Sequence, residues 1–215
     1  MKKKKNIIIC ICLTLMSIIY TILVKNVDVK NIGPNNTSVG FSTINNLFKN
    51  LIGSDMKIYK ITEIFGLLVF IICLFYGIIG IYQLIKRKSI KKVDKEIILM
   101  GIFYIIILFV YALFEKLEIN YRPILIDGKL EASYPSSHTI LALCVCISSL
   151  ILSKKYINKK YINITNIITL ILLFGVFIGR IMSGVHWISD IIGGIIISFT
   201  LIMYYITINN YIKNK

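Results

Sequence analysis

Six apolar runs constrain this chain more than any other feature of its sequence. They cover residues 7–24, 61–85, 97–114, 139–152, 164–178 and 191–208. Most are near the roughly 20 residues that a helix needs to cross a bilayer, and the fourth and fifth need flanking residues to complete the crossing. The apolar residues lie in long runs rather than in amphipathic stripes. We therefore predict an all-α, polytopic membrane protein: a single domain over residues 1–215, built as a six-transmembrane-helix bundle.

The first run follows Met1 and four lysines, which is also how a secretory signal peptide begins. No cleavage site of the small-x-small type follows the run. The favoured interpretation is an uncleaved first helix, with a signal peptide as the alternative.

The basic residues indicate a membrane orientation rather than a nucleic-acid partner. The chain has a net charge of +15, and with six spans both termini lie on one side of the membrane. That side carries 16 of the 25 basic residues but only two acidic ones, Asp94 and Glu96. Because cytoplasmic loops are rich in lysine and arginine, both termini are predicted to be cytoplasmic. The lipid bilayer accounts for the charge pattern, and no nucleic acid is expected to bind.

The five cysteines predict neither disulfides nor a metal site. All of them, Cys10, Cys12, Cys73, Cys144 and Cys146, lie inside predicted spans, where a thiol packs as a small polarizable group. No cysteine or carboxylate cluster surrounds the two histidines at metal-ligand spacing. We expect no metal and no other cofactor.

The longest connection, residues 25–60, is predicted to lie on the outer side and to contain a short helix. Within 41–52, apolar and polar residues alternate at helical spacing. The apolar stripe is too short to span, so the segment is interpreted as an interfacial helix. A helix packed over the mouth of the bundle is an equally good interpretation.

Three polar clusters at helix ends on that outer side hold the residues suited to chemistry. They are Lys116 with Arg122 and Pro123, then Ser136, Ser137 and His138, then Arg180, His186 and Asp190. Arginine forks match phosphate oxygens and lysine adds a point charge, so the cations describe an anion site. Free backbone N–H groups at Ser136 and Ser137, where a helix begins, would add to it.

The two histidines suit phosphoryl transfer. If the last helix begins near Val185, His186 and Asp190 share a face, and the carboxylate can hold one ring nitrogen. The other nitrogen is then a stronger nucleophile, and His138 is available as a general acid. Any one of these residues could merely cap a helix end. That both histidines occur together with Arg122 and Arg180 favours a catalytic phosphate site over helix capping.

The ordered clusters resemble the three-part signature of the type 2 phosphatidic acid phosphatase superfamily, which includes bacterial lipid phosphatases and vanadium-dependent haloperoxidases. The resemblance implies that His186 is the nucleophile that forms a phosphohistidine, Asp190 its orienting partner and His138 the acid for the leaving group. It implies that the phosphate is held without metal by a second set of groups: Lys116, Arg122, Arg180 and the backbone at Ser136 and Ser137.

The sequence departs from the family pattern at three positions. Five residues rather than six separate Lys116 from Arg122, and Glu115 stands at the usual lysine position. Ser137 replaces a glycine, and Gly179 replaces a serine. Because a lysine stem is long and flexible, we predict that Lys116 still contacts phosphate while Glu115 does not.

The function predicted is a metal-independent membrane lipid phosphatase that acts at the outer face. Its substrate would be a membrane lipid phosphate or diphosphate, such as a polyprenyl diphosphate, phosphatidylglycerophosphate or phosphatidic acid. Two alternatives stay open. In a lipid phosphotransferase a second substrate rather than water attacks the phosphohistidine, and a non-catalytic lipid-phosphate binding or transport protein keeps only the anion site.

Overall fold

The computed structural model describes residues 2–213 and is all-helical in that part, with isolated β-bridges but no strand. Lys215, one of the basic residues in the charge pattern, lies outside the described residues. The helices are α1 (Lys2–Asn26), α2 (Ser42–Ile52), α3 (Met56–Arg87), α4 (Lys95–Leu117), α5 (Ser137–Tyr156), α6 (Ile162–Met182) and α7 (Ile188–Lys213). All but α2 are long and apolar enough to cross a membrane, which confirms the six predicted spans.

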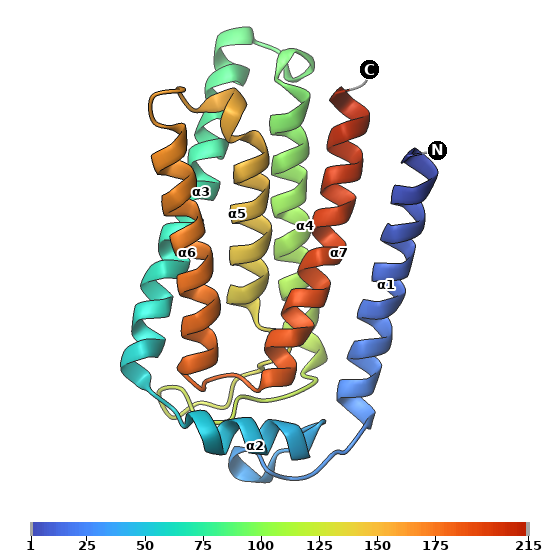
Figure 1. The fold of residues 1–215 in the computed structure, drawn as a ribbon, viewed down its shortest axis with the longest axis vertical. Helices are drawn as coiled ribbons and strands as arrows, with labels where there is room; N and C mark the ends of the chain where they lie inside the picture. Colours follow the sequence, from blue (N-terminus) through green and yellow to red (C-terminus); the bar gives the residue numbers. More distant parts are fainter. Residues whose placement is uncertain (1, 214–215) are drawn as a thin grey trace.

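Helix α5 is the most buried of the six spans and packs against α3, α4, α6 and α7 (Figure 1). Around it lies the largest core cluster, which includes Tyr76, Met100, Phe103 and Tyr205. Helix α1 packs at the side of the bundle along α7. Isoleucine and leucine side chains on the outer faces of the spans are exposed, as expected where lipid takes the place of a protein neighbour.

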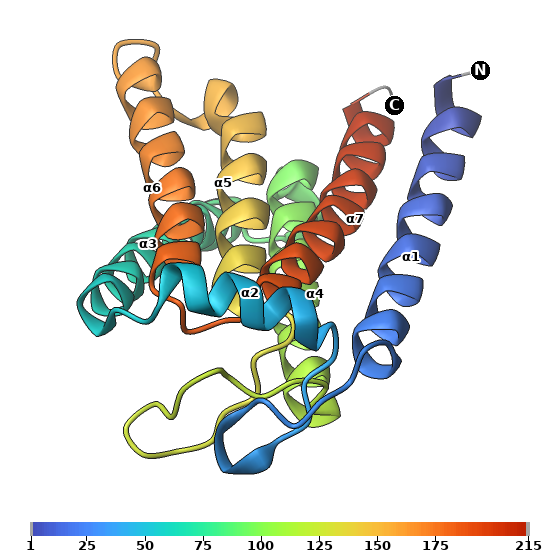
Figure 2. The ribbon, with the colours of Figure 1, turned by 60° about the horizontal axis from the view of Figure 1, so that its bottom comes forward.

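The two ends of the bundle differ. Both chain ends lie at one end, and α2 lies across the other, next to the long α4–α5 connection (Figures 1 and 2). The predicted polar clusters all fall at the end that carries α2.

Helix α2 turns its polar side to the bundle and its apolar side outward. Asn45 is buried and donates hydrogen bonds to the carbonyl of Gly40, at 2.7 Å, and to the hydroxyl of Ser189, at 2.9 Å. Leu47 and Leu51 on the other side are 55% and 75% exposed. The predicted helix is confirmed. It covers the end of the bundle and leaves an apolar stripe free, so the two interpretations of this segment are compatible.

Candidate active site

Two connections bring the polar clusters together at the α2 end. The α4–α5 connection folds back on itself, where the amide of Arg122 donates to the carbonyl of Glu131 at 3.0 Å. The α6–α7 connection contacts it through the indole of Trp187, which donates to the carbonyl of Tyr121 at 2.6 Å. Residues separated by more than 60 positions in the sequence therefore share one site.

His186 lies in the α6–α7 connection, before the start of α7. Its Nδ1 is 3.1 Å from the carbonyl oxygen of Ser133. Because a carbonyl can only accept, Nδ1 carries the proton in the neutral ring, and Nε2 has a free lone pair. Nε2 is buried and has no hydrogen-bond partner among the described residues.

Burial lowers the pKa of His186 well below its usual range, and nearby positive charge on Arg122 and Arg180 lowers it further. A histidine with a lowered pKa is neutral at neutral pH. The ring therefore presents an unprotonated Nε2, which is the form that can attack phosphorus.

Asp190 is positioned differently from the sequence prediction. Helix α7 begins at Ile188 rather than near Val185, so the two residues do not share a helical face. The carboxylate of Asp190 is 3.8 Å from Nδ1 of His186, beyond hydrogen-bond distance. It accepts instead from the amide of Trp187, at 3.0 Å, and thereby fixes the turn that carries His186.

Asn120 also orients this carboxylate, and the sequence analysis did not single it out. Its side-chain amide donates to Asp190 at 3.2 Å, and its side-chain oxygen accepts from the amide of Gly40 at 3.2 Å. Asn120 is buried. It joins the connection after α1, the α4–α5 connection and the start of α7.

Arg122 and Arg180 form the cationic part of the site. Arg122 is 8% exposed and Arg180 is fully buried. The ring of Tyr59 lies beside both, 6.0 Å from the first guanidinium and 5.1 Å from the second. Nη1 of each arginine is buried without a hydrogen-bond partner among residues 2–213. Buried cationic donors that lack partners are costly, and a bound anion with several oxygens would satisfy them.

The serines that precede His138 have separate roles. Ser136 is buried, and its amide donates to the carbonyl of Asp190 at 3.0 Å. This amide, predicted to hold phosphate, instead joins the start of α5 to α7. Ser137 begins α5 and lines the cavity in front of His186.

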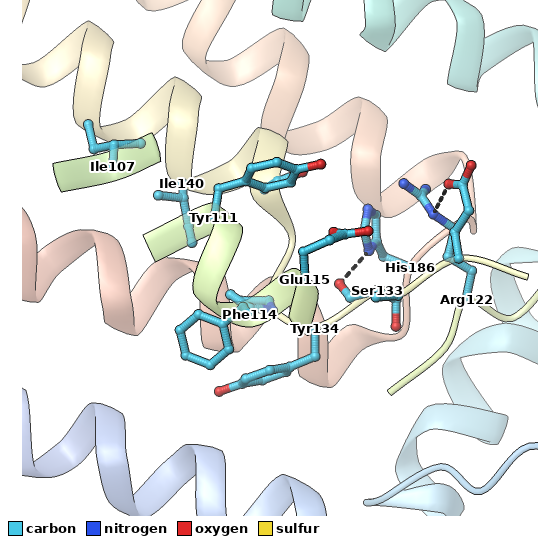
Figure 3. A pocket seen from close by; sticks show the side chains of 13 residues that line it. Ile107, Tyr111, Phe114, Glu115, Arg122, Ser133, Tyr134, Ile140 and His186 are labelled. Atoms are coloured by element: carbon cyan, nitrogen blue, oxygen red, sulfur yellow. Dashed lines mark hydrogen bonds and ion pairs between the residues drawn. The ribbon is translucent and has the colours of Figure 1, made fainter. Parts of the chain in front are cut away.

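That cavity has a volume of about 220 Å³ and two chemically different ends (Figure 3). His186 and Arg122 line the polar end. Ile107 and Phe114 from α4 and Ile140 from α5 line the other. Phe114 is seven positions after Ile107, which is about 10 Å along a helix. The cavity therefore extends from the polar loops into the membrane-spanning part of the bundle.

The structure differs from the sequence prediction at the first cluster. Glu115 and Lys116 are both exposed, but Glu115 lines the cavity and points into it, whereas Lys116 does not line it (Figure 3). Helix α4 continues to Leu117, so it includes both residues. Neighbouring helical positions are rotated by about 100°, and the connection after the helix cannot compensate for the one-residue shift.

Lys116→Ala should therefore change kcat/KM by less than about twofold. Glu115→Gln should raise it several-fold, because it removes a negative charge from the cavity that would hold an anion. The two variants are compared in phosphate-release assays with purified protein. A loss of more than tenfold in Lys116→Ala would show that this side chain reaches the phosphate during turnover.

Comparisons with a protein family and with a solved structure agree with this fold. Residues 110–213 match the model of the PAP2 superfamily. In structure, the chain is similar to a transmembrane PAP2 type phosphatidylglycerolphosphate phosphatase from Bacillus subtilis, with a TM-score of 0.61 and 20% sequence identity over 96% of this chain and 97% of that one. No curated protein matches the chain in sequence.

The family match confirms the resemblance predicted from the three clusters. Residues 110–213, which contain every predicted site residue, belong to the PAP2 superfamily. The chain is a multi-pass membrane protein with the fold of a transmembrane PAP2 phosphatase. The family match and the fold support a phosphoric ester hydrolase.

Proposed function

We propose that this single domain is a metal-independent lipid phosphatase that works through a phosphohistidine on His186. The observation that carries the proposal is the buried Nε2 of a neutral His186, which has no hydrogen-bond partner within residues 2–213 and lies close to two arginines whose donors also lack partners there. A phosphate bound by Arg122 and Arg180 would place its phosphorus within reach of that nitrogen. The apolar end of the cavity suits the chain of a lipid.

Two steps complete the reaction. Nε2 of His186 attacks phosphorus while the bond from phosphorus to the leaving oxygen breaks, and His138 gives that oxygen a proton. Water then attacks the phosphohistidine and gives a proton to the neutral His138, the phosphorus–nitrogen bond breaks, and neutral His186 and inorganic phosphate are released. Arg122 and Arg180 stabilise the charge on the phosphoryl oxygens in both steps, which is the main demand of phosphoryl transfer.

Phosphate release by purified protein in detergent tests this proposal. The substrates are a polyprenyl diphosphate, phosphatidylglycerophosphate and phosphatidic acid, each assayed with a chelator present. We expect release from at least one of them without an acceptor alcohol. Release that requires an acceptor would identify a phosphotransferase, and binding without release would identify a lipid-phosphate binding protein.

The site is proposed to face the outside of the cell, because the described lysine-rich connections lie at the opposite end of the bundle. A cysteine that replaces Gly128 in the α4–α5 connection should react with an impermeant thiol reagent in intact cells. A cysteine that replaces Ser89, between α3 and α4, should react only after lysis. The reverse pattern would place the site in the cytoplasm.

A further inference from the structure

A carboxylate outside the family motifs lies in the site. Glu63 belongs to α3, far in sequence from the residues that match the family. Its Oε1 is 3.4 Å from Nε2 of His138 and also accepts a hydrogen bond from Arg180. Ionisable residues are rare inside apolar spans and usually functional, and this one contacts the histidine that the reaction needs as an acid.

Close helix packing holds Glu63 in this position. Gly179 of α6 lies against Thr62, and a Cβ at Gly179 would come within 2.2 Å of the Thr62 side chain. Gly66, one turn after Glu63, lies against His138, and a Cβ there would come within 2.7 Å of the ring. The glycine that replaces the family serine at position 179 therefore lets α3 approach α6 closely enough for Glu63 to contact Arg180.

The charges around His138 come from four elements. Arg180 faces it from α6, Arg122 from the α4–α5 connection and His186 from the α6–α7 connection. His186 is neutral, whereas the positive charge on either arginine disfavours a proton on His138. Glu63 from α3 is the carboxylate that forms an ion pair with His138 among the described residues. Without it, His138 would face cations and would tend to lose the proton that a general acid must hold.

We propose that Glu63 is a positioning residue that favours the protonated form of His138, so that His138 can act as the acid in the reaction proposed above. Nε2–H of the imidazolium donates to Glu63. The second proton is on Nδ1, a buried atom without a hydrogen-bond partner in the described chain. That proton goes to the leaving oxygen as the bond to phosphorus breaks, and His138 becomes neutral while Nε2–H stays paired with Glu63.

Arg180 keeps a role in phosphate binding despite its bond to Glu63. The carboxylate contacts Nη2, whereas Nε and Nη1 are without hydrogen-bond partners in the described chain. Glu63 and a phosphate can therefore use different nitrogens of one guanidinium. This arrangement favours a role for Glu63 through His138 over a role as a plug that the substrate must displace.

Leaving-group dependence tests the proposal in Glu63→Gln, which keeps the shape of the side chain and removes its charge. With a lipid alkyl phosphate, whose alkoxide needs a proton, kcat/KM should fall by about 10²-fold to 10³-fold, the contribution of a general acid. With p-nitrophenyl phosphate, whose leaving group needs no proton, it should change by less than about threefold. With the alkyl substrate, the activity should also be lost at a lower pH than in wild type as the pH rises.

Glu131→Gln is the matched control. Glu131 forms an ion pair with Arg122 at 3.0 Å and lines the cavity in front of His186, whereas the ion pair of His138 in the described chain is with Glu63. This variant should change kcat/KM for both substrates by the same factor. The pH at which activity is lost on the alkaline side should stay the same as in wild type. Equal losses on both substrates in Glu63→Gln, with an unchanged pH profile, would overturn the proposal and leave Glu63 as a partner of Arg180 alone.

A measurement without turnover separates this proposal from the proposed function. The chain has two histidines, so in a His186→Ala background the imidazole NMR signals report His138 alone. Glu63→Gln should lower the protonation midpoint of His138 by about one pH unit or more, the effect of losing an adjacent opposite charge. An unchanged midpoint would overturn the role of Glu63 whether or not the protein releases phosphate.

Discussion

His186→Ala should abolish phosphate release, with a loss of about 10⁴-fold or more, and should remove the covalent phosphoenzyme. The expected loss is large because the proposed reaction has no other nucleophile: Nε2 of His186 forms the bond to phosphorus. Residues that act as one catalytic unit give losses of this size or larger when one is removed. Turnover is measured as phosphate release, and the intermediate as label from a ³²P-labelled substrate that is labile to acid and stable to base.

His138→Ala provides the comparison. It removes the proposed acid but keeps the nucleophile, so label should still form from p-nitrophenyl phosphate. Label that persists in His186→Ala and disappears in His138→Ala would reverse the two roles. The lowered pKa of His186 adds a second check. Its neutral form should persist below pH 6.5, the usual midpoint of histidine, so the acid limb of phosphoenzyme formation should lie below that value.

The fold could be predicted from hydropathy because a bilayer requires long apolar helices. Hydropathy did not predict the ends of α5. Its apolar run covers 139–152, but the helix extends over Ser137–Tyr156. Just after the run, the hydroxyl of Ser153 donates to the carbonyl of Leu150 three residues earlier. A helix inside a bundle can hold such polar residues, and a hydropathy scale counts them against the span.

The sequence also identified the two histidines and two arginines that the structure brings together, but not how they are held. The four-residue spacing predicted a direct contact from Asp190 to His186. In the structure the carboxylate is bonded to the backbone of the turn, and a carbonyl from another connection holds the ring. No local pattern identifies the residue that donates that carbonyl, because Ser133 is 53 positions away.

Glu63 and Asn120 were missed for different reasons. Glu63 stands inside the apolar run 61–85, and a carboxylate in a span is a signal that could have been used. Asn120 is one polar residue among several in a connection, and only the three-dimensional contact with Asp190 distinguishes it. Glu115 rather than Lys116 lines the cavity because α4 continues through both residues to Leu117. Pro123 disfavours helical geometry at Arg122, but it does not identify the residue at which α4 ends.

Arg180→Lys should lower kcat/KM by about 10²-fold to 10³-fold although the charge is kept. Arg180 is fully buried, its guanidinium lies beside the ring of Tyr59, and it donates to Glu63 while Nε and Nη1 have no hydrogen-bond partner among the described residues. The planar guanidinium of Arg180 can donate to a carboxylate and to a phosphate at the same time, through different nitrogens. An ammonium on a flexible stem cannot reproduce that geometry. The expected loss corresponds to about 3–4 kcal/mol of transition-state stabilisation.

Competitive inhibition by inorganic phosphate tests whether this loss arises in the anion site, since its inhibition constant should rise together with the loss of kcat/KM. The matched control is Arg87→Lys, at the other end of the bundle, where Arg87 is paired with Asp94 at 2.7 Å. It makes the same change of cation far from the cavity and should leave kcat/KM and phosphate inhibition within about twofold, as expected for an exposed ion pair. Wild-type kinetics in Arg180→Lys would mean that Arg122 alone binds the phosphate, and that Arg180 serves only to hold Glu63 against His138.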